Sequence, residues 1–229
     1  MLNWNHTVKR SVARLGARIP IRITHVLRRT SDLIDSQRWL REHSLCPFKA
    51  SFSTRERIFD LIAAEIHDKQ VLYLEFGVFE GYSMRYWSRL LSNPKSILHG
   101  FDSFEGLPET WKENHLKGRF AKHGALPEVA DERVKFFKGW FNETLLGYTL
   151  PPHEELIVNI DCDLYSSAKC VLDRLKDSIR IGTWLYLDEF GSWDHEGRAF
   201  RELVEETDMR FEPVAESAAI WSAAFRRIG

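Results

Sequence analysis

Hydrophobic and polar residues follow one another in blocks that predict alternating strands and helices. Short, mostly apolar runs typical of buried strands occupy residues 71–75, 96–102, 133–137, 155–161 and 183–188. Between them, apolar residues recur three or four positions apart, the spacing that places them on one face of a helix. Five strand–helix units of this kind predict an α/β fold with a mostly parallel sheet. Two last runs, residues 209–214 and 219–226, predict a C-terminal antiparallel hairpin.

The segment before the first strand is predicted to be helical. Apolar residues stand at helical spacing until a proline interrupts them, at Trp4, Val8, Val12, Leu15 and Ile19. A second helix is expected within residues 32–50. Residues 53–56 read Ser-Thr-Arg-Glu, a capping box that opens a third helix with Ser53 as its cap.

The stretch VLYLEFGVFEGYS joins the first strand to a helix through two glycines. Gly77 and Gly81 let the backbone approach a ligand, and the start of the following helix offers free N–H groups. Strand, glycine turn and helix in this order form the nucleotide-type cofactor site of an open parallel sheet. The spacing Glu75-x-Gly77-x-x-x-Gly81 fits the G-x-G-x-x-G fingerprint of dinucleotide enzymes poorly. A plain turn between strand and helix is the alternative.

Acidic residues gather where the predicted strands end. Six of them are Glu75, Asp102, Asp161, Asp163, Asp188 and Glu189. The carboxyl ends of parallel strands meet at one edge of the sheet, so these side chains would repel one another unless something cationic lay among them. Asp102 comes 25 residues after Gly77, and a carboxylate there can accept both hydroxyls of a ribose. That role suits any adenosine cofactor, and a loop cap for Ser103 or Phe104 is the alternative.

The acids of the last two parallel strands suggest a metal site. Three oxygen ligands from two strands, Asp161 with Asp188 and Glu189, suit a hard divalent cation such as Mg²⁺. Asp161 and Asp163 would point to one face if the strand continued, with Cys162 turned toward the packed core. Solvated carboxylates that cap the following helices are the alternative.

Five segments taken in order resemble the macrocin O-methyltransferase family: EFGVFEGYSMRYW, GFDSFEGLPE, GWFNETL, NIDCDLYSSAKCVLDRL and LYLDEFGSW. The similarity covers about residues 50–206, and its most specific part is FDSFEGLPE followed by D-x-D-L-Y-x-S. Members of that family are class I S-adenosylmethionine-dependent enzymes that methylate sugar hydroxyls in antibiotic biosynthesis. The resemblance implies a Rossmann-like class I methyltransferase fold, with S-adenosylmethionine and Mg²⁺ as cofactors.

The same resemblance implies roles for individual residues. The methionine end of the cofactor is held by Glu75, Gly77, Gly81 and Ser83. Asp102 holds the ribose with Ser103 beside it, and Trp140 falls near the adenine. The ligands of Mg²⁺ are Asp161, Asp188 and Glu189. Asp163 matches the position of the general base, whereas Glu189 departs from the aspartate that the family usually has there.

Length and composition place the chain among ordinary globular proteins. Its 229 residues suit one domain with an appendage, which we divide into a basic helical extension at 1–50 and a domain at 51–229. No apolar run is long enough to cross a membrane, and no secretory signal stands at the N-terminus. The three cysteines form no C-x-x-C pair, which indicates a reducing compartment. We therefore expect a cytoplasmic protein.

The net charge of −1 conceals a strong asymmetry between the two ends of the chain. Residues 1–31 carry seven lysines and arginines and no acid, so this basic arm is +7 and the remaining 198 residues are −8. The arm could lie on an anionic membrane surface. It could equally pack its apolar stripe on the acidic body of its own chain or of a twin chain in a homo-oligomer. No nucleic-acid partner is expected.

Together these patterns predict an O-methyltransferase that moves a methyl group from S-adenosylmethionine to a hydroxyl of a small, sugar-containing acceptor, assisted by Mg²⁺. The long connection at residues 103–131, together with the N-terminal segment, would roof the acceptor pocket, with Trp111 and Phe120 as walls. His195 is expected at the surface. One alternative is a binding protein of the same fold without catalysis, tethered by its basic arm. Another is an NAD-linked oxidoreductase, which the glycine spacing disfavours.

Overall fold

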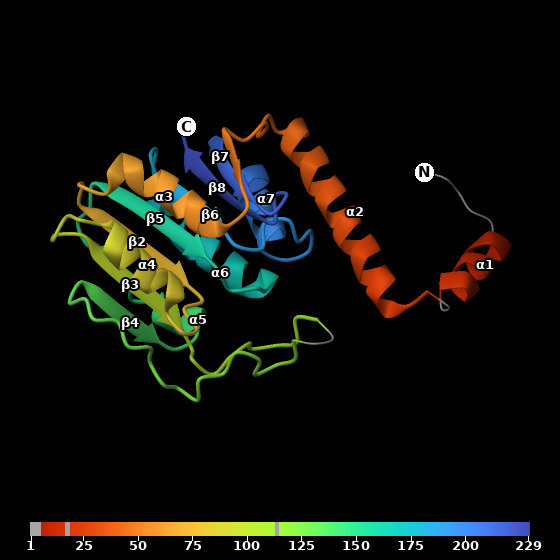
Figure 1. Ribbon diagram of the computed structural model, residues 1–229, viewed down its shortest axis with the longest axis horizontal. Helices are drawn as coiled ribbons and strands as arrows, with labels where there is room; N and C mark the ends of the chain where they lie inside the picture. Colours follow the sequence, from red (N-terminus) through yellow and green to blue (C-terminus); the bar gives the residue numbers. More distant parts are fainter. Residues whose placement is uncertain (1–5, 17–18, 113–114) are drawn as a thin grey trace.

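A computed structural model describes residues 6–16, 19–112 and 115–229 of the chain. It shows an eight-stranded sheet between two layers of helices (Figure 1). The strands are β1 (Ala50–Phe52), β2 (Val71–Phe76), β3 (Ile97–Asp102), β4 (Val134–Lys138), β5 (Glu155–Ile160), β6 (Trp184–Leu187), β7 (Phe211–Ser217) and β8 (Ser222–Arg227). The helices are α1 (His6–Gly16), α2 (Ile21–Glu42), α3 (Arg55–Ile66), α4 (Tyr82–Leu90), α5 (Phe141–Thr144), α6 (Tyr165–Leu175), the 3₁₀ turn η1 (Lys176–Ser178) and α7 (Glu196–Glu206).

The strand order is β1-β7-β8-β6-β5-β2-β3-β4. The strands from β4 to β6 are parallel, and β8 runs antiparallel to both β6 and β7. This confirms the predicted α/β sheet with its C-terminal antiparallel pair. The chain leaves β2 toward β3 and β4 on one side, then returns to β5 and β6 on the other. A switch of direction between β2 and β5 is where open parallel sheets bind their ligands.

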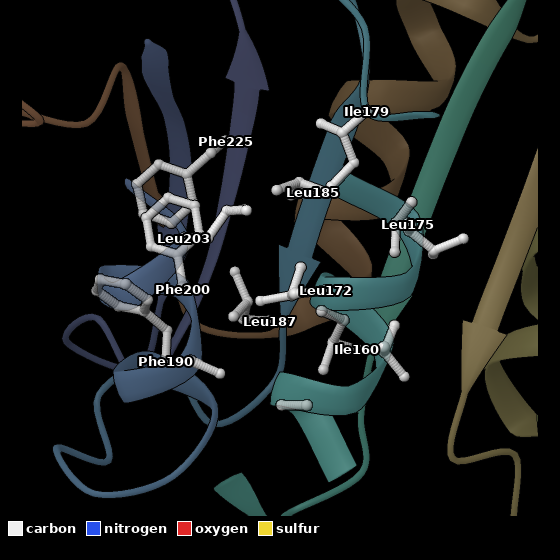
Figure 2. Close-up of a cluster of buried hydrophobic side chains, with 14 of the residues drawn as sticks. Ile160, Leu172, Leu175, Ile179, Leu185, Leu187, Phe190, Phe200, Leu203 and Phe225 are labelled. Carbon is white, nitrogen blue, oxygen red and sulfur yellow. The ribbon is translucent and has the colours of Figure 1, made fainter. Parts of the chain in front are cut away.

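Each face of the sheet has its own hydrophobic core. α3 and α4 cover one face, and α5, α6, α7 and the end of α2 cover the other. Figure 2 shows part of the second core, with side chains from β5, α6, β6, α7 and β8. The labelled residues are Ile160, Leu172, Leu175, Ile179, Leu185, Leu187, Phe190, Phe200, Leu203 and Phe225. Every residue of β2 is buried, as expected of a central parallel strand covered on both sides.

The structure moves several of the predicted boundaries before β2. α2 begins directly after Pro20 and ends at Glu42, so this helix starts 11 residues before the predicted range 32–50 and ends 8 residues before the end of that range. A proline at a helix start is well suited because its fixed φ matches a helix and its missing N–H is not needed there. The N-cap of α3 is Thr54 rather than Ser53, and Thr54 makes no capping bond with its side chain. Arg55 is therefore the first residue of α3.

α1 and the first part of α2 reach away from the sheet (Figure 1). α2 is anchored by its last turns, where Trp39 donates a hydrogen bond to Glu205 at 2.8 Å and packs edge-on against Phe200. Apolar side chains of α1 and the first half of α2 are exposed, among them Val12, Leu15, Ile23, Val26 and Leu27. Trp4 and Arg18, which belong to the predicted amphipathic pattern, lie outside the described residues. None of the helices in the described ranges is long and apolar enough to cross a membrane.

Candidate active site

A pocket of about 670 Å³ opens at the carboxyl edge of the sheet, beside the switch between β2 and β5. Its volume is in the range of sites that hold cofactors. The predicted site residues that line it are Glu75, Gly77, Ser83, Asp102, Ser103, Trp140, Asp161 and Asp163. Gly81, Asp188 and Glu189 are not among its lining residues. The sequence pattern therefore located most of this wall.

The glycine turn brings β2 and the end of β5 into very close contact. Gly77 has a φ of +95°, and a Cβ there would lie 1.8 Å from the carbonyl oxygen of Asp161. No other residue fits, so this turn is more than a flexible connection. Gly81 has a φ of +73° as the N-cap of α4, and a Cβ there would press on Pro127. Gly81 therefore shapes the turn without lining the pocket. Its contact with a cofactor stays a prediction.

Asp102 organises the backbone on the β2–β3 side of the pocket. Its Oδ2 accepts hydrogen bonds from the amides of Val78 at 2.8 Å and Phe79 at 2.9 Å. Its Oδ1 accepts from the amide of Phe104 at 2.7 Å, so the loop cap considered from the sequence is present. A carboxylate can accept about four hydrogen bonds, so Asp102 keeps capacity for a ligand on the pocket side. Its contact with a ribose stays a prediction.

Glu75 is a buried acid in the pocket wall. The hydroxyl of Tyr73 donates to Glu75 at 2.7 Å and accepts a hydrogen bond from Asn159 at 2.6 Å. Burial raises the pKa of Glu75 to about 8, although the bond from Tyr73 opposes the shift. A ligand carrying an ammonium group beside Glu75 would favour the ionised carboxylate.

Arg55 joins the acids of β5 and β6. Its Nη1 donates to Asp161 at 2.9 Å and to Asp188 at 3.1 Å. The hydroxyl of Tyr186 also donates to Asp188, at 2.5 Å. The sequence reasoning missed this role, because Arg55 was considered only as part of a capping box. The signal that could have found it was the need for a cation among six clustered acids.

Glu196 fixes the two segments that follow β5 and β6. It is fully buried, and its Oε1 accepts hydrogen bonds from the amides of Cys162 at 2.8 Å and Asp163 at 2.9 Å. Its Oε2 accepts from the amide of Glu189 at 2.9 Å. In the sequence Glu196 is only the first acid of a predicted helix, so its role as a bridge between two strand ends carried no local signal.

Asp163 does not continue the strand as predicted. β5 ends at Ile160, and Asp163 has a φ of +65°, in the left-handed region that asparagine and aspartate tolerate best. Asp161, Cys162 and Asp163 nevertheless all line the pocket, and Cys162, which was expected to turn toward the packed core, also packs there. Burial raises the pKa of Asp163 to about 6, with the charge of Lys112 acting in the opposite direction. Asp163 is therefore ionised at pH 7 and more basic than an ordinary aspartate.

Lys112 lies in the connection between β3 and β4 and affects Glu189 electrostatically. Burial raises the pKa of Glu189 to about 8, and Lys112 opposes that shift most strongly. The ammonium of Lys112 lies 3.1 Å from the centre of the Trp111 ring. Trp111 in turn packs edge-on against His195 at 5.8 Å, so His195 is half-buried rather than at the surface.

Of the two residues predicted to form walls of the acceptor pocket, Phe120 lines the pocket and Trp111 does not. Phe120 lines the pocket and packs edge-on against Phe79, with the ring centres 5.5 Å apart. Trp111 is not among the lining residues. The acceptor role of both residues stays a prediction.

The three predicted metal ligands do not fit Mg²⁺ as they are arranged. Mg²⁺ requires nearly octahedral oxygen ligands at about 2.0–2.1 Å. Asp161 and Asp188 are instead ion-paired to the same nitrogen of Arg55. Within the described ranges no three histidine, cysteine, aspartate or glutamate side chains are grouped to hold a metal ion. The structure therefore gives no support to the predicted Mg²⁺ site.

The parallel sheet, its antiparallel C-terminal pair and the pocket beside the glycine turn are those of a class I methyltransferase fold. The sequence profile of the macrocin O-methyltransferase (TylF) family matches residues 53–226, and the chain belongs to this family. The match confirms the resemblance drawn from the five sequence segments.

Relatives and solved structures agree with this assignment. A tetracenomycin rhamnosyl 4'-O-methyltransferase of Streptomyces olivaceus is 27% identical over 141 residues, covering 51% of this chain and 52% of that one. The demethyldecarbamoylnovobiocin O-methyltransferase of Streptomyces niveus is 27% identical over 106 residues, covering 39% and 40%. The chain thus spans about half the length, or less, of the curated relatives it matches.

Two solved structures share the fold at low sequence identity. The O-methyltransferase NovP superimposes with a TM-score of 0.57 at 21% identity, covering 75% of this chain and 76% of that one. The calicheamicin methyltransferase CalS11 superimposes with a TM-score of 0.54 at 18% identity, covering 98% and 94%. At such identities the likeness establishes the fold alone.

Proposed function

We propose that this protein transfers a methyl group from S-adenosylmethionine to a hydroxyl group of a small, sugar-containing acceptor. Family membership and the names of the relatives, a rhamnosyl-tetracenomycin and a demethyldecarbamoylnovobiocin O-methyltransferase, support the reaction and the acceptor class. One observation carries the proposal. The same pocket has Glu75 and Asp102 on one side and Asp163, with a pKa of about 6, on the other.

The β2–β3 side of the pocket suits S-adenosylmethionine. Gly77 allows the close approach of the backbone, and Glu75 offers a buried carboxylate to an ammonium group. Asp102 keeps acceptor capacity for ribose hydroxyls, and Trp140 presents a partly exposed ring, 36% exposed, to an adenine. When bound, this cofactor supplies a methyl group that is activated by a sulfonium.

Asp163 is the proposed general base. An alcohol is far too weak an acid to ionise at pH 7, so its proton must leave as the new bond forms. Transfer forms an oxygen–carbon bond and breaks a carbon–sulfur bond, whose electron pair stays on sulfur. The hydroxyl proton moves to a carboxylate oxygen of Asp163. Holding the acceptor oxygen in line with the methyl carbon supplies much of the remaining rate enhancement.

Mg²⁺ assistance was part of the expectation from the family resemblance and is not part of this proposal. The pairing of Asp161 and Asp188 with Arg55 leaves these oxygens committed to a protein cation. No step of the reaction above is assigned to a metal.

The test is turnover of methyl-labelled S-adenosylmethionine with a panel of hydroxylated acceptors, together with calorimetric titration of S-adenosylhomocysteine. We expect binding of S-adenosylhomocysteine and transfer of the label to a glycosylated acceptor. Binding without transfer to any acceptor would favour the non-catalytic alternative. Tight binding of NADH with no binding of S-adenosylhomocysteine would overturn the assignment in favour of an oxidoreductase.

A further inference from the structure

We propose that Arg55 supplies the positive charge that Asp161 and Asp188 need at the acidic edge of the pocket, so that methyl transfer in this protein needs no divalent metal ion. The inference rests on the proposed function, since it concerns the same reaction and the same pocket. It departs from the Mg²⁺ role that the family resemblance implies.

Arg55 stands where a bridging ion would have to stand. One nitrogen, Nη1, lies 2.9 Å from Asp161 Oδ2 and 3.1 Å from Asp188 Oδ1. An ion that bridged these two oxygens would sit about 2.0–2.1 Å from each, within the space of that nitrogen. Metal binding therefore requires Arg55 to leave both carboxylates, and breaking a largely buried ion pair is strongly unfavourable.

The backbone position of Arg55 makes this cation a fixed part of the site. It is the first residue of α3, which packs on the sheet through Ile58, Phe59 and Ile62. Its guanidinium also lies 5.7 Å from the centre of the Tyr82 ring, on the pocket wall. A guanidinium stays charged at every pH at which the protein is folded, so its charge does not depend on metal supply.

Arg55 thus matches the charges of Asp161 and Asp188 with a group of the protein itself. Glu196, the buried acid that bridges the ends of β5 and β6, is satisfied by three backbone amides.

The first experiment measures metal binding independently of activity. Wild-type protein is titrated with Mn²⁺, with free ion followed by electron paramagnetic resonance. We expect no stoichiometric binding to the wild type. Arg55→Gln removes the cation and frees both carboxylates, so this variant should gain affinity for Mn²⁺. Arg57→Gln, an exposed position on the same helix paired only loosely with Asp60 at 3.8 Å, is the matched control and should stay like the wild type.

The second experiment measures turnover after exhaustive chelation and after addition of Mg²⁺. We expect equal wild-type rates in both conditions. Arg57→Gln, the control of the first experiment, should behave like the wild type in both conditions.

Two results would overturn the inference. One is stoichiometric Mn²⁺ binding to the wild type that disappears in Asp161→Asn. The other is a wild-type rate that chelation abolishes and Mg²⁺ restores, which would leave the proposed function intact. Absence of turnover in every condition would contradict the proposed function instead, and the Mn²⁺ titration would still decide between a protein cation and a metal.

Discussion

The two halves of the pocket are each organised by a carboxylate that accepts three backbone amides. On the β2–β3 side Asp102 binds the amides of Val78, Phe79 and Phe104. On the β5–β6 side Glu196 plays the same part for three other amides. The difference lies in burial, because Asp102 is half-buried on the pocket wall and Glu196 is fully enclosed.

This difference separates two uses of the same chemical group. A carboxylate on the wall can hold the backbone and still accept a ligand, so we expect Asp102 to serve both as a scaffold and as a cofactor contact. On the β5–β6 side Glu196 does not line the pocket, and the acids that do are Asp161 and Asp163. Contact of Asp163 with the substrate stays a prediction.

The largest expected effect belongs to the acceptor half alone. Asp163→Asn should lower turnover by about 10²–10⁴-fold, the usual range for loss of a general base, without changing the affinity for S-adenosylhomocysteine. The wild-type rate should rise as the pH increases through about 6, because the base works only when its raised pKa leaves it unprotonated. That inflection should vanish in the variant. Asp173→Asn, exposed on α6, is the control, and an unchanged rate in Asp163→Asn would remove the base from the mechanism.

The next largest expected effect is a loss of stability when Glu196, the buried carboxylate that holds three backbone amides, is replaced. In the wild type, three backbone N–H groups donate to the two carboxylate oxygens of Glu196. Glu196→Gln replaces one of these oxygens by an amide nitrogen, which cannot accept, so at least one buried N–H loses its partner. We expect the free energy of unfolding to fall by about 3 kcal/mol. Urea denaturation measures this. Glu206→Gln, which removes an exposed ion pair with Lys169, should change it by less than about 1 kcal/mol. Equal stability of the two variants would show that Glu196 does not hold the strand ends together.

Asp102→Ala should mainly weaken the binding of S-adenosylhomocysteine to the cofactor half of the pocket. The variant loses hydrogen bonds to a charged acceptor, so S-adenosylhomocysteine affinity should fall by about 2 kcal/mol, or roughly 30-fold. Calorimetry measures the change, and Glu105→Gln, exposed in the same loop, is the control. Unaltered affinity would make Asp102 a scaffold only, like Glu196, and would erase the distinction between the two halves.

The smallest effect on either half is expected from the basic arm. If residues 1–31 meet anionic lipid, the wild type should sediment with acidic vesicles at low salt and dissociate at high salt, because exposed charges are screened. Deletion of residues 1–31 should abolish sedimentation and leave S-adenosylhomocysteine affinity unchanged. A wild type that ignores the vesicles, with a deletion variant that becomes insoluble, would instead assign the arm to packing, on its own body or on a second copy.

The sequence allowed the central strands to be predicted because they are apolar on both faces. β2 and β5 stand out as buried runs, and the motifs placed around them located most of the pocket wall. β1 has only three residues, which is too short for a periodic pattern, and it was missed. The start of α2 was predicted too far along the chain because the basic, polar residues after Pro20 obscure the helical pattern there.

The acceptor half was harder to predict because its key contacts join distant parts of the chain. Arg55 reaches acids 106 and 133 positions away, and Glu196 meets the amide of Cys162 at a separation of 34. Nothing local in either segment shows the partner. The left-handed turn at Asp163 likewise depends on those bonds, whereas the strand pattern alone favours an extended chain.

The single carboxylate of Glu196 also links the motions of two strand ends. The amide hydrogens of Cys162, Asp163 and Glu189 are all protected by the same buried group. None of the three can exchange with solvent through this contact unless Glu196 releases its partners, so their hydrogen-exchange rates should rise and fall together. The segments after β5 and β6 would then open as one cooperative unit, with the proposed base inside it.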